Sequence, residues 1–283
     1  MSDDTKSDRR PFSQRHGLVP TRTDLQVDFI DRELRTRLYN AFYEHFVEAV
    51  TTDGFWTINP VHVHIWTEHL VQRRDLIGQN AFLSVVLERF TKGAWYEVYD
   101  LVEFSALLDE SFLRDVNRVL EAQFAGYRFV GTRLVPITSP DEIGAIETAL
   151  AASTATGTLS GVREHLEAAL DLFANRSKPD YRNAIKEAIS AVEYLARKLV
   201  GQPTTLGDAL KRIASTGTVD IHPALKGAFS QLYGWTSDGS GIRHALTDQA
   251  ADITPEDARF MIVACSAFVN YLIAKAHKTG VAF

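Results

Sequence analysis

The stretch Tyr-Arg-Phe-Val-Gly-Thr-Arg-Leu-Val-Pro-Ile at residues 127–137 decides the architecture of this 283-residue chain. β-Branched and aromatic residues flank Gly131-Thr132 on both sides, a pattern that predicts two short strands joined by a tight turn. Before and after this stretch, the apolar residues instead recur at helical spacing. The sequence therefore predicts an all-α fold in which a short β-hairpin joins two helical domains.

The residues before the hairpin predict a bundle of amphipathic helices. From Asp24 to Val50 the apolar side chains recur mostly at four-residue intervals, which places them on one face of a long helix. Further helices are predicted at Val61–Arg73, Asn80–Phe90, Trp95–Leu108 and Ser111–Ala125. The polar residues 1–23 are expected to form a flexible segment, so the N-terminal domain is predicted to span residues 24–138.

The residues after the hairpin predict a linker and a second bundle. Ser139, Pro140 and Glu142 form a helix-start pattern, so residues 139–158 are expected to be a linker helix and loop between the domains. A four-helix bundle is predicted over residues 159–283, with one shorter helix near residues 205–214. The four helices are expected at Leu159–Ala174, Pro179–Val200, Pro223–Trp235 and Pro255–Lys278.

Composition narrows the setting of the protein. The net charge of -6 argues against nucleic-acid or membrane binding over the whole surface, so any RNA contact is expected to be confined to one site. The single cysteine, Cys265, lies in an apolar run and is expected to be a core residue, which suits a reducing compartment. We find no apolar run that we expect to span a bilayer and no signal-peptide pattern, and we predict a cytoplasmic protein.

The best candidate for a functional site is the glycine-containing turn at residues 237–246, which carries the adjacent pair Arg243 and His244. Arginine is always charged and histidine changes charge near neutral pH, so the pair suits phosphate binding or phosphodiester chemistry. Three acids are candidates to orient the pair, with Glu193 ranked first, followed by Glu187 and Asp238.

Each of these residues also has a purely structural interpretation. The Arg-His pair fits a capped helix start, and Glu193 fits an ion pair with Arg197 one turn later. Glu187 fits a solvated helix face, and Asp238 fits a turn. The choice between a functional and a structural role stays open at this stage.

Other motifs give no further site. His62, His64 and His69 lack the spacing of a zinc site, because residues two apart on a helix face opposite sides. The glycines at residues 234–241 follow a predicted helix, whereas a dinucleotide fingerprint follows a strand. We therefore expect no metal and no cofactor, and no catalytic centre in the N-terminal domain.

Three segments of the first half resemble the N-terminal domain of AbiJ-type abortive-infection proteins. These segments are Phe-Ser-Gln-Arg-His-Gly at residues 12–17, Leu-Arg-Thr-Arg-Leu-Tyr-Asn at residues 34–40 and Leu-Val-Pro-Ile-Thr at residues 134–138. In the second half, the helix around residues 183–193 and the turn at residues 241–246 are similar to HEPN-like helical domains. The resemblance implies bacterial phage defence, commonly by metal-independent RNA cleavage in a HEPN homodimer whose Arg and His converge across the two-fold axis.

The pair departs from the HEPN pattern in one respect. Active HEPN motifs place four to six residues between the Arg and the His, whereas Arg243 and His244 are neighbours. Three functions therefore remain open: an endoribonuclease, a non-catalytic HEPN-like sensor that binds RNA or a nucleotide, and a dimeric scaffold for a neighbouring effector. A phage-derived or nucleotide signal is the expected trigger for any of them.

Overall fold

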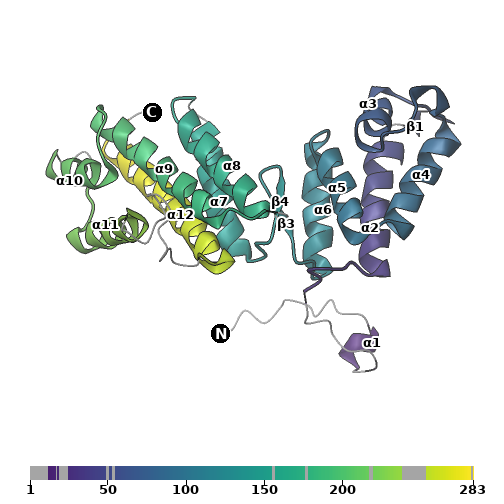
Figure 1. Ribbon diagram of the computed structural model, residues 1–283, viewed down its shortest axis with the longest axis horizontal. Coiled ribbons are helices and arrows are strands. Elements are labelled where there is room, and N and C mark those ends of the chain that lie inside the picture. The colour runs from purple at the N-terminus through teal and green to yellow at the C-terminus, as the bar shows by residue number, and fades with distance from the viewer. Residues whose placement is uncertain are drawn as a thin grey trace, which may run out of the picture.

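A computed structural model describes residues 12–16, 18, 25–48, 51–52, 55–154, 157–175, 178–216, 219–237, 253–281 and 283. The described residues are mainly helical and form two helical bodies with a hairpin between them (Figure 1). The predicted all-α class is confirmed. The buried apolar side chains fall into two separate clusters, one for each half of the chain.

The N-terminal half is built from short helices around a core rich in phenylalanine. Its elements are α1 (Phe12–Arg15), α2 (Arg32–Tyr43), η1 (Glu44–Glu48), β1 (Thr51–Thr52), β2 (Phe55–Trp56), α3 (Pro60–His64), η2 (Ile65–His69), η3 (Arg74–Leu76), α4 (Gln79–Lys92), α5 (Trp95–Ala106) and α6 (Glu110–Ala122). Strands β1 and β2 form a small antiparallel pair. The α2 stripe that includes Leu34, Leu38 and Phe42 is fully buried, as its four-residue spacing predicts.

The first long helix begins later than the sequence predicts. Asp31 caps α2 by accepting a hydrogen bond from the Leu34 amide at 2.8 Å. The residues before Asp31 are held on the segment that follows α6, because the Gln26 backbone hydrogen-bonds to Phe124 and Gly126. The buried Gln26 side chain also donates to the Gln123 carbonyl and accepts from the Asp31 amide. These contacts keep residues 25–30 out of the helix.

The hairpin of β3 (Arg128–Val130) and β4 (Arg133–Val135) belongs to both cores. Neighbouring residues on a strand face opposite sides. Phe129 is buried in the N-terminal core, whereas Val130 and Val135 are buried in the C-terminal core. The Asn117 side chain of α6 bonds the Phe129 amide and carbonyl at 2.8 and 3.0 Å. The hairpin therefore contributes side chains to the cores of both halves.

The C-terminal half consists of longer helices. They are α7 (Pro140–Thr154), α8 (Ser160–Ala174), α9 (Tyr181–Val200), α10 (Leu206–Thr216), α11 (Pro223–Ser237) and α12 (Pro255–Lys278). The start of α9 is capped by Asp180, and the start of α12 by Thr254 in a capping box with Asp257. Helix α9 packs extensively on α8 and α12, and α12 also packs on α7.

The helices at the centre of the C-terminal half differ in one member from the four-helix bundle that the sequence predicts. Helix α7 buries Ile146, Ala149 and Leu150 in the C-terminal core, and Asn270 of α12 donates to its Ala145 carbonyl at 2.8 Å. Helix α11 buries none of its described side chains fully and lies at the edge of the group (Figure 1). The helix expected to be a linker is thus a core helix, and α11 is peripheral.

Helix α12 is long and apolar enough to cross a membrane by length and composition, so our expectation that no run reaches that limit is wrong. Its residues Met261, Ile262, Phe268 and Val269 lie in the core. Burial against α7 and α9 accounts for its apolar composition.

Two backbone features mark unusual positions. Gly161 of α8 lies so close to α9 that an added Cβ would come within 2.4 Å of the Tyr194 ring. Val71, two residues after the end of η2, has a φ of 50° and is 79% exposed. A β-branched residue rarely adopts a left-handed backbone, so the Val71 position is strained.

Candidate functional site

Two of the five predicted site residues lie among the described residues, and three do not. Arg243, His244 and Asp238 lie outside the described residues. Glu187 and Glu193 lie on α9, six residues apart and thus roughly 240° around the helix. The two acids therefore face different neighbours.

Glu193 is the more buried of the two acids, with 9% of the residue exposed. Its carboxylate forms a short ion pair with Arg197 one turn later, the pair expected from the sequence. The Arg197 Nε also donates to the Thr204 carbonyl at 2.8 Å. Because Glu193 follows Ile189 by four residues, the two share one face of α9.

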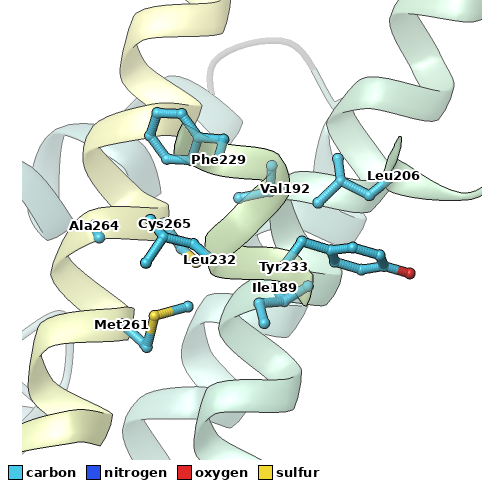
Figure 2. A pocket seen from close by; sticks show the side chains of 9 residues that line it. All are labelled: Ile189, Val192, Leu206, Phe229, Leu232, Tyr233, Met261, Ala264 and Cys265. Carbon is cyan, nitrogen blue, oxygen red and sulfur yellow. The ribbon is translucent and has the colours of Figure 1, made fainter. Parts of the chain in front are cut away.

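The same face of α9 borders an apolar pocket (Figure 2). Ile189 and Val192 line it from α9, and Tyr233 lines it with its hydroxyl pointing outward. Its remaining lining comes from α10, α11 and α12: Leu206, Phe229, Leu232, Met261, Ala264 and Cys265. The pocket volume of about 20 Å³ has room for one water molecule, so we interpret it as a packing gap.

Cys265 at this pocket is not a nucleophile. Burial raises the pKa of its thiol to about 12, so the thiol stays protonated at neutral pH. Its role is packing, as the sequence predicts.

The two helices that border the pocket lead into the predicted turn. Helix α11 ends at Ser237, four residues after Tyr233, and α12 begins at Pro255, six residues before Met261. At 1.5 Å per helical residue, these helix ends lie roughly 6 and 9 Å along their axes from the pocket. The connection that carries Arg243 and His244 therefore joins two helices that line the same pocket as Ile189 and Val192 of α9.

Glu187 has a partner that the sequence analysis missed. The His165 Nδ1 of α8 lies 2.7 Å from the Glu187 carboxylate, and both side chains are partly exposed. The carboxylate fixes Nδ1 as the donor, so Nε2 of a neutral His165 is an acceptor. The two residues are 22 positions apart on separate helices, and only the packing of α8 on α9 brings them together.

A second histidine and acid cluster lies in the N-terminal half. His45 Nδ1 is 2.9 Å from Asp109, and its Nε2 is 2.9 Å from Asp115. Burial alone would lower the pKa of His45, but the hydrogen bonds to Asp115 and Asp109 outweigh burial and raise it. The pKa of Asp109 falls to about 2: burial opposes the shift, but hydrogen bonds from Ser111 and His45 dominate.

The geometry of this cluster indicates a structural role. Both ring nitrogens of His45 face carboxylates, which accept hydrogen bonds, so both nitrogens carry protons. An imidazolium held in this way has no free nitrogen for a substrate proton. The cluster ties η1 to α6 by charge.

The three histidines near residue 65 have separate environments. His62 is buried; its Nδ1 accepts from the Asn59 amide, and its Nε2 donates to the Phe46 carbonyl. His64 and His69 pack against the Phe104 ring, at centroid distances of 5.3 and 5.0 Å. Across the described residues, no three His, Cys, Asp or Glu side chains converge as a metal site.

Comparison with known families identifies the first half. The family described as AbiJ N-terminal domain 4 matches residues 10–152, just over half of the chain. The chain belongs to this family, and its AbiJ domain associates it with bacterial abortive infection. No curated protein and no solved structure gives a significant match. The matched region begins within the predicted N-terminal tail and ends within α7, which packs in the C-terminal core.

Proposed function

We propose that the C-terminal half is the effector of an abortive-infection protein and that it cleaves RNA without a metal. The observation that carries this proposal is the position of Glu193. Its buried carboxylate follows Val192, which lines the pocket that α11 and α12 border, and the connection between α11 and α12 carries Arg243 and His244 in sequence. An Arg, a His and an acid in one helical half of the chain are the groups that a HEPN-like nuclease requires.

In the proposed reaction, the ribose 2′-hydroxyl attacks the adjacent phosphorus and the 5′-oxygen leaves. His244 moves the proton from the attacking to the leaving oxygen, first as base and then as acid. Arg243 neutralises the charge that develops on the phosphorane oxygens. Glu193 orients the pair from α9. The products are a 2′,3′-cyclic phosphate and a 5′-hydroxyl end.

The protein is proposed to act as a homodimer. Adjacent side chains on a helix point about 100° apart, so an adjacent Arg and His serve one phosphate only if the turn departs from helical geometry or a second chain supplies one of the groups. A two-fold axis near the pair supplies the second copy. The N-terminal half is proposed to recognise the phage-derived or nucleotide trigger.

The test is cleavage of total tRNA by the purified full-length chain in the presence of a chelator. His244→Ala is expected to abolish cleavage with the dimer mass unchanged, because the proton carrier is lost. Arg243→Ala is expected to weaken RNA binding as well, because a charge-assisted phosphate contact is lost. His277→Ala, at an exposed position near the end of α12, is the matched control and is expected to cleave normally.

The acids allow a finer comparison on one helix. Glu193→Gln is expected to reduce cleavage, whereas Glu187→Gln is expected to leave it near the wild-type rate, because Glu187 faces α8 and His165. A larger loss of cleavage in Glu187→Gln than in Glu193→Gln would assign the orienting role to the pair of His165 and Glu187 instead of Glu193. If wild-type protein binds RNA without cleaving it, the non-catalytic sensor replaces the nuclease.

A further inference from the structure

A second cavity lies between the hairpin and helix α8, where the two halves of the protein meet. It has a volume of about 200 Å³ and is open to solvent. The hairpin residues and Leu150 belong to the region that matches the AbiJ family, whereas the α8 residues lie beyond it. Cavities at the junction of two bodies are favoured places for small ligands.

Two arginines from different elements line this cavity. Arg133 extends from β4 and Arg163 from α8, and both side chains are about half exposed. The Arg133 Nε lies 2.5 Å from Asp171, and the Arg163 Nε lies 2.7 Å from Glu167. Within the described part of the chain, the hydrogen bonds of both guanidinium groups run through Nε. The Nη groups of each fork are left for a further acceptor.

The acid partners explain how these charges are stable without a ligand. Asp171 and Glu167 neutralise the two guanidinium groups, but each arginine contact is through Nε alone and each pair is half exposed. Such exposed pairs are only weakly stabilising. Two phosphate oxygens that accept from the two Nη groups of one guanidinium make stronger, bidentate contacts. A phosphate group therefore competes with the two carboxylates for the guanidinium groups.

The rest of the lining limits the size and shape of the ligand. The hairpin tip at Gly131, which has a φ of 59°, and Thr132 supplies backbone groups and a hydroxyl. Leu150 and Leu170 form an apolar side. Drug-sized ligands occupy roughly 300–1,000 Å³, so a cavity of about 200 Å³ suits one phosphate group and part of the group attached to it.

We propose that this cavity binds a phosphate monoester through Arg133 and Arg163. None of the residues that line the cavity is a proposed nuclease residue, so the proposal stands whether or not the protein cleaves RNA. The ligand contacts residues of both halves, which makes it a ligand of the junction. Free phosphate and a nucleoside monophosphate offer the same group, and the experiment below distinguishes them.

Binding is measured by calorimetry on the full-length chain at low salt, with inorganic phosphate, adenosine 5′-monophosphate and adenosine as separate probes. Phosphate and adenosine 5′-monophosphate are expected to bind, and adenosine is not. Tighter binding of the monophosphate identifies an organic ester as the ligand, whereas equal binding identifies the free anion. Arg133→Gln and Arg163→Gln are each expected to weaken binding roughly tenfold, because each removes a charge-assisted contact.

Two further variants separate binding from folding. Asp171→Asn removes the internal competitor of Arg133 and is expected to tighten phosphate binding by up to about fivefold, which a folding defect cannot mimic. Arg37→Gln is the matched control, because Arg37 pairs with Glu33 at i,i+4 with similar exposure but lies on α2. Three results would overturn the proposal: no saturable binding of either phosphate probe at millimolar concentration, equal binding of adenosine, or an equal loss in Arg37→Gln.

Discussion

The close approach of α8 to α9 at Gly161 predicts that Gly161→Ala destabilises the C-terminal half. An added Cβ would lie 2.4 Å from one carbon of the Tyr194 ring and 2.7 Å from two others. Carbon atoms pack favourably at about 3.5–4.0 Å, so the ring must move by roughly 1 Å or more. Tyr194 packs against the C-terminal core, and its hydroxyl donates to the Thr158 carbonyl, so this movement disturbs existing contacts.

The magnitude follows from two opposing effects. Replacing a helical glycine with alanine stabilises a helix by up to about 1 kcal/mol, and overpacking costs about 1–3 kcal/mol. A contact as short as 2.4 Å puts the overpacking cost in the upper part of this range, at about 2–3 kcal/mol, so the net loss expected for Gly161→Ala is about 1–2 kcal/mol. Gly144→Ala on α7 is the matched control, because nothing lies within 4 Å of its added Cβ. It is expected to stabilise the protein by about 1 kcal/mol.

Thermal unfolding followed by circular dichroism measures both variants. For a chain of this size, 1 kcal/mol corresponds to about 2–4 °C, so Gly161→Ala is expected to lower Tm by about 2–8 °C. Gly144→Ala is expected to raise Tm by about 2–4 °C. A Gly161→Ala protein as stable as the Gly144→Ala protein would refute the close packing of α8 on α9.

Three further predictions concern other parts of the chain. Val71→Gly is expected to raise stability by about 1 kcal/mol in urea unfolding, because it relieves the backbone strain at φ 50° and the lost side chain is 79% exposed; a lower stability would contradict the strain. His45→Gln is expected to destabilise the protein most between about pH 4 and 6.5. The raised pKa of His45 gives stability that is present below pH 6.5 and is lost as pH rises through the folded-state pKa. The lowered pKa of Asp109 gives stability that is lost as pH falls from 3.8 towards about 2. Equal destabilisation by His45→Gln at pH 5 and pH 9 would contradict a stabilising ion pair between charged His45 and the two aspartates. A fragment that ends at residue 152, where the family match ends, is expected to self-associate in size-exclusion chromatography, because it uncovers the apolar stripe of α7; a monomeric fragment with no dye-binding apolar surface would show that α7 is satisfied without α8 and α12.

The sequence predicts the elements of this fold better than their packing. The hairpin on either side of Gly131-Thr132 and most helix positions follow from turn chemistry and apolar spacing. The sequence predicts a linker where α7 lies, because apolar spacing identifies an apolar face without identifying which core covers it. Ile146 and Leu150 reveal their partner only when α12 is placed beside them.

The candidate site shows the same limit. The ion pair of Glu193 with Arg197 is local, one helical turn apart, and it follows directly from the sequence. The pairs His165 with Glu187 and His45 with Asp109 join residues 22 and 64 positions apart. Nothing in a local pattern marks such partners, since only tertiary packing sets their distance.

The burial of α7 restricts how this family domain can be recombined. The match to the AbiJ domain ends inside a helix whose apolar stripe is covered by α8 and α12, outside the matched region. A gene fusion that exchanges the second half must therefore bring a new groove shaped for the same stripe. Helix α7 and the hairpin thus form a docking element of the matched domain. This domain is compatible only with following domains that offer a complementary apolar groove.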